Sequence, residues 1–235
     1  MKSVRNLGGL FLLVFCSYCS VSNKSQDFQG ISLGKVLYKD NFERLKNHWI
    51  IETPKHPNSR VFVSDSKLVI DVAAGATIWF DKKLSGNYLV SYKRTVVMKN
   101  EVNDRLSDLN QFWMASDPKN QDLFRRTGVF EEYDSLRLYY VGMGGNTNNT
   151  TRLRKYLGDG SKPLLKEYTD KEHLLLANKQ YHITLIVRNG LSELFVDGKK
   201  FFSYQDTQPL TEGYFGFRTT ASRQEIEDFK IFALK

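Results

Sequence analysis

Two arginines and a tyrosine alternate along residues 150–156, and this spacing suits the binding of an acidic ligand. Successive side chains of a β-strand point to opposite faces, so Arg152, Arg154 and Tyr156 would share one face. With Arg218 and Arg105 they would form a cationic wall, because guanidinium groups match the geometry of a carboxylate such as that of a uronic acid. A cationic edge strand that faces solvent explains the same pattern equally well.

Residues 103–117 concentrate polar side chains around a tryptophan in an otherwise apolar chain. Because an unpaired buried charge is costly, these groups need a reason to be there. One interpretation is a substrate site, and the other is an Asp–Arg pair that holds a loop. The residues concerned are Asp104, Arg105, Asp108, Asn110, Gln111 and Trp113.

Hydrolysis of a glycosidic bond needs two carboxylates, about 5–9 Å apart depending on the stereochemical outcome. Two pairs of acidic residues are candidates for this role. They are Asp104 with Asp108, and Asp117 with Glu131.

Elimination from a uronate has different requirements, namely a cation that neutralises the carboxylate and a base that removes the C5 proton. Arg152 or Arg154 would supply the cation. Tyr139, Tyr140 or His182 would supply the base. A lone histidine on a regular strand is more often structural, so His182 is the weaker of these candidates.

Aromatic rings bind sugars by stacking on their apolar faces, and each ring can equally well belong to the core. Trp79 lies between Ile78 and Phe80, which favours the core for this residue. The aromatic candidates are Trp79, Trp113, Tyr139 and Tyr140.

The chain shows no cluster of histidines, carboxylates or cysteines with metal-ligand spacing, and we expect no cofactor. Asn146, Asn148 and Asn149 lie beside a Gly-rich stretch and offer oxygen ligands for a structural Ca²⁺. Asparagine and glycine are also the usual residues of tight turns. Asn146 is in addition a candidate for binding sugar hydroxyls.

The elements that would position these groups are short strands. From residue 35 onward, runs rich in Val, Ile, Tyr and Phe are separated by Gly, Asn and Asp, which is typical of a sandwich or barrel. Asn189-Gly190 and Asp197-Gly198 predict tight hairpin turns. Residues 103–177 are richer in loops, where function usually resides. We therefore predict an all-β fold, an antiparallel β-sandwich.

Residues 1–22 predict a secretory signal peptide. Lys2 and Arg5 precede a short apolar run at residues 10–15, and small or polar residues follow up to Ser22. We therefore expect export to the periplasm or the outer cell surface.

Cys16 and Cys19 are the two cysteines of the chain, and either would carry a lipid if the signal is that of a lipoprotein. Contact with a membrane is expected only through such an anchor. Residues 23–34 would then form a tether and residues 35–235 a single domain without cysteine.

The formal net charge of +8 indicates a surface that attracts polyanions. For an exported protein these are acidic polysaccharides rather than nucleic acid, for which no motif is present. A scatter of solvated lysines on sheet edges explains the charge equally well. The expected partner is an oligo- or polysaccharide, with no nucleic acid.

The C-terminal third contains a recognisable order of strands and turns. A Tyr-x-Ile-x-Leu strand from Tyr181 is followed by the Asn-Gly turn, a Phe-Val-Asp-Gly hairpin at 195–198 and Gly-Tyr-Phe-Gly-Phe-Arg at 213–218. This order resembles the last strands of concanavalin A-like lectin and glucanase jelly rolls, and residues 36–42 resemble their first strand.

Residues 104–115, 139–146, 150–152 and 213–219 are similar to a family of secreted bacterial proteins. That family is related to YesU-like proteins and is often labelled as glycosyl hydrolases of polysaccharide-utilisation loci. The resemblance implies a jelly roll with a carbohydrate-sized groove. Jelly-roll glucanases commonly carry their carboxylates as Glu-x-Asp-x-Glu on one strand, and this pattern is absent here.

The same fold occurs in hydrolases, in lyases and in proteins that only bind glycans, so the fold alone leaves several functions open. We expect a secreted protein that cleaves or processes a polysaccharide with uronic acids, as a hydrolase or lyase. The alternatives are a non-catalytic glycan-binding module and an adhesion or scaffolding domain. The predicted catalytic residues are Asp104, Asp108, Tyr140 and His182, and the predicted substrate-binding residues are Arg105, Asn110, Trp113, Tyr139, Asn146, Arg152, Arg154, Tyr156 and Arg218.

Overall fold

The computed structural model describes residues 27–235. The predicted signal peptide, the two cysteines and the first part of the predicted tether lie outside the described residues. Within residues 27–235, no helix has the length and apolar character needed to cross a bilayer.

Strands are the dominant element of the described chain, which confirms the predicted all-β class. Its strands are antiparallel wherever they pair. Their bounds are β1 (Asp27–Phe28), β2 (Ile31–Asp40), β3 (Trp49–Glu52), β4 (Arg60–Ser64), β5 (Lys67–Phe80), β6 (Leu84–Ser85), β7 (Tyr88–Val97), β8 (Leu109–Ser116), β9 (Arg137–Gly144), β10 (Thr150–Leu157), β11 (Leu164–Tyr168), β12 (Gln180–Arg188), β13 (Leu191–Val196), β14 (Lys199–Gln205) and β15 (Glu212–Leu234).

Three short helical elements interrupt the strands. Two are 3-10 helices, η1 (Phe130–Ser135) and η2 (Lys171–His173). The third, α1 (Gly145–Asn148), is a four-residue turn in which Asn146 and Thr147 have left-handed φ angles of 52° and 56°.

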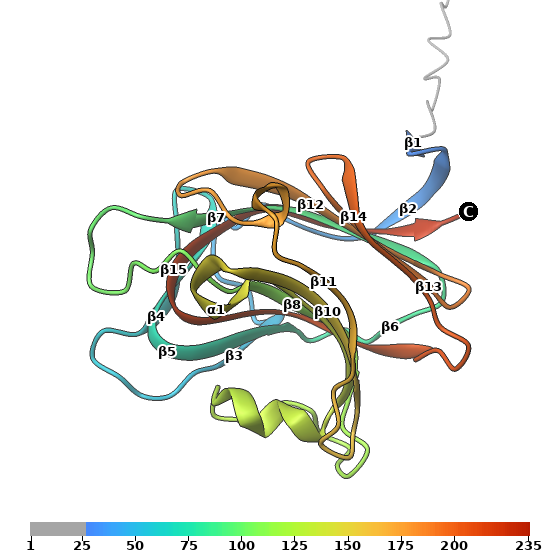
Figure 1. Cartoon of the computed structure of the whole chain (residues 1–235), viewed down its shortest axis with the longest axis horizontal. Coiled ribbons are helices and arrows are strands. Elements are labelled where there is room, and N and C mark those ends of the chain that lie inside the picture. Colours follow the sequence, from blue (N-terminus) through green and yellow to red (C-terminus); the bar gives the residue numbers. More distant parts are fainter. Residues whose placement is uncertain (1–26) are drawn as a thin grey trace, which may run out of the picture.

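The strands form one hydrogen-bonded sheet that folds into two facing layers (Figure 1). The order is β11-β10-β9-β8-β15-β7-β12-β13-β14. The long strand β15 belongs to both layers, because residues 214–218 pair with β8 and residues 223–233 pair with β7. This arrangement confirms the predicted sandwich.

The main core lies between the two layers and follows from the alternation of side chains. Phe217 of β15 meets Tyr92 of β7 edge to face, with ring centroids 4.9 Å apart. Trp113 of β8 reaches the opposite layer, where its indole nitrogen donates to the Ser192 hydroxyl at 3.2 Å. Buried aliphatic residues of β12 and β13 complete this core.

A second apolar cluster lies on the outer side of the layer that contains β8, β9 and β10. Trp79, Phe112, Tyr140 and Tyr156 emerge on this side, opposite to the main core. Residues 117–136, which include η1, fold back over them and are called the covering segment below. Figure 1 shows η1 on the outer side of this layer, away from the other layer. The covering segment therefore determines how much of this sheet face remains open.

The first long strand begins earlier than predicted, because β2 starts at Ile31 within the stretch expected to be a tether. Phe28 pairs with Ile31, and both pack with Leu33 against a small cluster around Phe195. The predicted Asn189-Gly190 turn is confirmed, with left-handed φ angles of 49° and 78° between β12 and β13.

Candidate functional site

A pocket of about 240 Å³ opens on the outer sheet face, beside the covering segment, and we call it the basic pocket. Six of the residues predicted from the sequence line it: Asp108, Tyr140, Asn146, Arg152, Arg154 and Tyr156. The other lining residues are Phe130, Gly142, Gly145, Thr150 and Lys162.

Strand alternation and one glycine create this pocket. Arg152, Arg154 and Tyr156 share a face of β10, as the sequence pattern predicts, and Tyr140 faces the same way from β9. Gly142 pairs with Arg152 across the two strands. A Cβ atom at Gly142 would lie 2.1 Å from the Tyr140 hydroxyl, so the lack of a side chain there leaves room for the tyrosine.

Two of the three cations of the basic pocket already have carboxylate partners. Arg152 pairs with Glu167 of β11, and Lys162 lies 2.6 Å from a carboxylate oxygen of Asp134. With its amide oxygen turned towards Arg152, Asn146 accepts from both terminal guanidinium nitrogens at 3.3 Å. Asp108, the one carboxylate among the described residues that line the pocket, pairs with Arg105.

Arg154 differs from these cations. Its guanidinium donates to the backbone carbonyl of Lys162 at 2.8 Å, and no carboxylate among the described residues pairs with it. Because the side chain is half-buried and lines the pocket, its remaining donors are available to an anionic ligand.

The two tyrosines of the basic pocket are hydrogen-bond donors at neutral pH. Burial raises the pKa of Tyr140, and the neighbouring Tyr156 and Asp108 add to this effect. Burial also raises the pKa of Tyr156, with a further contribution from Asp134. The Thr150 hydroxyl is buried and has no hydrogen-bond partner among the described residues. The pocket thus combines cations, hydroxyls and aromatic faces.

Arg218 and Asn110 are predicted to bind substrate, but the structure buries both side chains, and Arg218 lies beneath the covering segment. The Arg218 guanidinium donates to the Gly128 carbonyl at 2.6 Å and to the Thr77 hydroxyl at 3.2 Å. It also lies 5.1 Å from the centre of the Phe130 ring. Arg218 is 1% exposed and Asn110 is 3% exposed, so both residues support the pocket without lining it.

Trp113 and Tyr139 face the main core instead of the pocket. Their rings stack with centroids 5.5 Å apart, and the Tyr139 hydroxyl donates to Asp206 at 2.6 Å. Because adjacent strand residues point to opposite faces, Tyr139 and Tyr140 cannot both line one groove, and the same holds for Phe112 and Trp113.

Three further predicted residues lie outside the basic pocket. Asp104 accepts backbone hydrogen bonds from Lys99 and, at 3.1 Å, from Glu101, and so holds a loop. Arg105 bonds Asp108 and the carbonyl of Ala221, which matches the structural Asp–Arg pair considered from the sequence. His182 lies on the other layer, with a ring nitrogen 2.8 Å from the Ser91 hydroxyl.

The candidate carboxylate pairs are not brought together in the basic pocket. Asp104 caps its own loop, whereas Asp108 lines the pocket. The Asp117 side chain is buried and pairs with Arg126 at 2.8 Å within the covering segment.

Glu52 is a buried carboxylate beneath the covering segment that the sequence pattern does not single out. It is 4% exposed and accepts hydrogen bonds from the Trp79 indole at 2.8 Å, the Tyr133 hydroxyl at 2.7 Å and the Arg126 backbone at 2.8 Å. Burial raises its pKa, against the lowering effect of these hydrogen bonds. A glutamate that ends the apolar run Trp49–Glu52 was the available signal. Glu52 anchors the covering segment to the sheet.

The asparagines of the α1 turn are engaged in local structure. The Asn148 amide bonds the backbone of Leu175 through both its nitrogen, at 2.9 Å, and its oxygen, at 2.8 Å. The Asn149 side chain donates to the carbonyls of Asn146 and Thr147. These contacts agree with turn chemistry, and the Ca²⁺ site stays a prediction.

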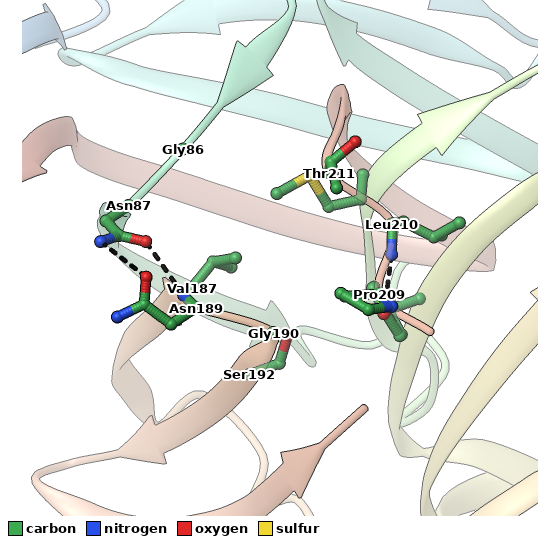
Figure 2. A pocket seen from close by; sticks show the side chains of 11 residues that line it. Gly86, Asn87, Val187, Asn189, Gly190, Ser192, Pro209, Leu210 and Thr211 are labelled. Atoms are coloured by element: carbon green, nitrogen blue, oxygen red, sulfur yellow. Dashed lines mark hydrogen bonds between the residues drawn. The ribbon is translucent and has the colours of Figure 1, made fainter. Parts of the chain in front are cut away.

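A second cavity, of about 260 Å³, lies at the loops that join β6 to β7, β12 to β13 and β14 to β15 (Figure 2). Asn87 and Asn189 approach each other at its rim, with an amide hydrogen bond of 3.3 Å. None of the described residues that line this cavity is charged. It therefore lacks the ionic groups that distinguish the basic pocket.

Comparison with known proteins identifies the fold but not the activity. Residues 70–229 match the model of a family described as a domain of unknown function, DUF6250. A search of curated proteins finds no match.

Three solved structures share the architecture at low sequence identity. A Bacillus subtilis protein of unknown function with a galectin-like fold has a TM-score of 0.71 and 20% identity over 87% of this chain and 98% of its own. The endo-β-1,3-glucanase of Pyrococcus furiosus has a TM-score of 0.62 and 10% identity, over 89% and 98%. The carbohydrate-binding module CBM66 of B. subtilis has a TM-score of 0.55 and 12% identity, over 81% and 99%.

These likenesses confirm the predicted jelly-roll architecture. The narrower resemblance to YesU-like proteins stays a prediction.

Proposed function

This chain belongs to the DUF6250 family, and from the geometry of the basic pocket we propose that it binds an acidic glycan, with a uronate seated against Arg154. The observation that carries the proposal is the half-buried Arg154 guanidinium without a carboxylate partner among the described residues. A sugar carboxylate supplies the anion that this group lacks.

The rest of the pocket suits a sugar ring. Phe130, Tyr140 and Tyr156 offer aromatic surface, and the tyrosine and Thr150 hydroxyls offer polar contacts for ring hydroxyls. Both a glucanase and a carbohydrate-binding module share this fold, which supports a carbohydrate ligand. Export, as residues 1–22 predict, would bring the pocket into contact with extracellular polysaccharides.

The number of carboxylates that line the pocket favours binding over hydrolysis. Hydrolysis needs two, and among the described residues lining the basic pocket only Asp108 has one. That carboxylate is already paired with Arg105. Glu52 is buried under Tyr133 and does not line the pocket.

Elimination is the second candidate function, because Tyr140 and Arg154 line the same pocket. In that step the Asp108 carboxylate would take the C5 proton and the C4–O bond would break as the C4=C5 double bond forms. The Tyr140 hydroxyl, whose pKa burial raises, would give its proton to the leaving oxygen. Incubation with polygalacturonate would test this candidate, since elimination creates a double bond that absorbs ultraviolet light. Binding without any such product assigns the pocket to recognition alone.

Calorimetric titration with oligogalacturonate and with a neutral galacto-oligosaccharide of equal length tests the proposed function. We expect heat of binding from the acidic oligomer and none from the neutral one. Arg44→Ala is a matched control, because Arg44 is exposed and lies outside the residues that line the pocket. Equal binding of both oligomers, or of neither, would contradict the proposal.

Replacing Gly142 by alanine should weaken this binding while leaving the fold intact. The added Cβ would lie 2.1 Å from the Tyr140 hydroxyl and 2.6 Å from the ring carbon that bears it, so the ring must move into the pocket space. The same titration measures the loss. Arg44→Ala is again the control, since Arg44 is exposed and does not line the pocket. Unchanged affinity in Gly142→Ala would place the ligand elsewhere.

A further inference from the structure

We propose that the basic pocket takes the end of an acidic glycan chain and excludes internal stretches, an inference that rests on the proposed function. The covering segment closes the pocket on the side of β8, and Lys162 closes it at the end where Tyr156 lies. The open sheet face of this layer is thereby reduced to a pocket that admits a terminal sugar.

One row of paired residues across the sheet shows where the open surface ends. Arg152 pairs with Gly142, Gly142 with Asn110, and Asn110 with Arg218. Arg152 and Gly142 line the pocket, whereas Asn110 is 3% exposed and Arg218 is 1% exposed. A glycan that crosses the strands in this direction therefore meets a closed surface directly after Gly142.

The closure consists of direct contact between the covering segment and the sheet. The Gly128 carbonyl accepts from Arg218 at 2.6 Å, and a Cβ atom at Gly75 would lie 2.1 Å from that same oxygen. Phe130 and Tyr133 lie over the guanidinium, 5.1 and 5.2 Å from their ring centres. No space for a sugar ring remains between these two surfaces.

The pocket is also bridged at the end where Tyr156 lies. Lys162, from the loop between β10 and β11, reaches the covering segment through Asp134 at 2.6 Å. Its ammonium group lies 5.6 Å from the centre of the Phe130 ring and 5.7 Å from that of Tyr156. A chain running along β10 therefore ends against this bridge.

The end of the pocket next to the α1 turn and the side of the edge strand β11 remain for the rest of the chain. Asn146 is exposed there, and Arg152 is half-buried at the same rim. A terminal uronate can thus occupy the pocket while the following sugars leave past Asn146. An internal sugar would need open exits on two opposite sides, whereas across the strands the side of β8 is closed and along β10 the end at Tyr156 is closed.

The covering segment is held by buried polar contacts. Glu52 bonds the Tyr133 hydroxyl and the Arg126 backbone, and Asp117 pairs with the Arg126 guanidinium. Moving the segment away would leave these buried polar groups without partners, which is costly. We therefore expect the segment to stay in place when ligand binds.

Counting protein molecules bound per glycan chain tests this inference on the unmodified protein. Polygalacturonate fractions of increasing length would be saturated with protein and analysed by light scattering. We expect the number of bound molecules per chain to stay constant as the length increases. Digalacturonate should compete fully, because a terminal unit makes all the pocket contacts.

A number of bound molecules that rises in proportion to chain length would overturn the chain-end inference and leave glycan binding standing. Absence of binding to every fraction and to digalacturonate would instead contradict the proposed function. Arg154→Ala should lower the affinity for every fraction and for digalacturonate by about thirtyfold, and Arg44→Ala should leave both the affinity and the count unchanged. These outcomes separate the two proposals.

Discussion

Replacing Arg154 by alanine is expected to weaken oligogalacturonate binding by about 2 kcal/mol, roughly thirtyfold, as for a charge that loses its partner in a complex. In the free protein this guanidinium bonds only the Lys162 carbonyl among the described groups. Arg152 already pairs with Glu167, so Arg152→Ala should have the smaller effect. Calorimetric titration of the two variants measures this difference.

A lysine at position 154 separates charge from geometry. Lysine keeps the positive charge but cannot form the two parallel hydrogen bonds of a guanidinium, so Arg154→Lys should bind with intermediate affinity. The exposed Arg44 supplies the control, because its replacement by alanine should leave binding unchanged. If Arg152→Ala weakened binding more than Arg154→Ala, the uronate carboxylate of the ligand would contact Arg152 and not Arg154.

The architecture could be predicted because its signals are local. Short runs of β-branched and aromatic residues, together with turns such as Asn189-Gly190, indicate antiparallel strands without knowledge of their partners. The alternation that places Arg152, Arg154 and Tyr156 on one face is equally local, and the structure shows the three together. The start of β2 was missed, although Ile31 and Leu33 already show this alternation.

Which face each strand turns outward could not be predicted, because that depends on non-local pairing. Tyr139 and Tyr140 were both assigned to the groove, although neighbouring strand residues face opposite sides. Only the pairing of β9 with β8 and β10 shows that Tyr140 faces the pocket. The same limit applies to Trp113, which looked like a sugar platform and is buried in the core.

The covering segment was unpredictable for a related reason. Its contacts join residues far apart in the sequence, such as Glu52 with Tyr133 and Gly128 with Arg218. An arginine beside aromatic residues could equally have bound substrate or held a loop, and for Arg218 the structure shows the second arrangement.

Replacing Glu52 by glutamine is expected to lower the free energy of unfolding by about 1–3 kcal/mol, the range for a buried hydrogen-bonding group left unsatisfied. The carboxylate accepts on both oxygens, from Arg126 on one and from Trp79 and Tyr133 on the other. A glutamine amide has only one accepting atom, so its NH₂ group must face another donor. Urea unfolding measures the loss.

Detachment of the covering segment should accompany this loss. Trypsin should cleave next to Arg125 and Arg126 faster in Glu52→Gln than in the unmodified protein, because the backbone of Arg126 loses its acceptor. Glu131→Gln is the matched control, since Glu131 is an exposed residue of η1 in the same segment. Equal stability and equal cleavage of the two variants would show that Glu52 does not anchor the segment.

The pH dependence of this difference follows from the raised pKa of Glu52. Burial, opposed by hydrogen bonds from Arg126, Tyr133 and Trp79, holds the pKa of the folded carboxyl above its ordinary value of 4.5. The folded protein therefore binds this proton more tightly than the unfolded chain. The resulting stability is complete below pH 4.5 and is lost as the pH rises through the folded pKa.

Glutamine does not titrate, so the stability deficit of Glu52→Gln should be larger in mildly acidic buffer than at neutral pH. Comparing the two proteins at each pH largely cancels the contribution of the other carboxyl groups to the pH dependence of stability. One of these is Asp117, whose pKa is lowered by hydrogen bonds from Arg126, Lys119 and Asn120 against the effect of burial. A deficit that shrinks on acidification would mean that Glu52 is held as a stabilised anion, and that the segment is anchored by charge rather than by a buried acid.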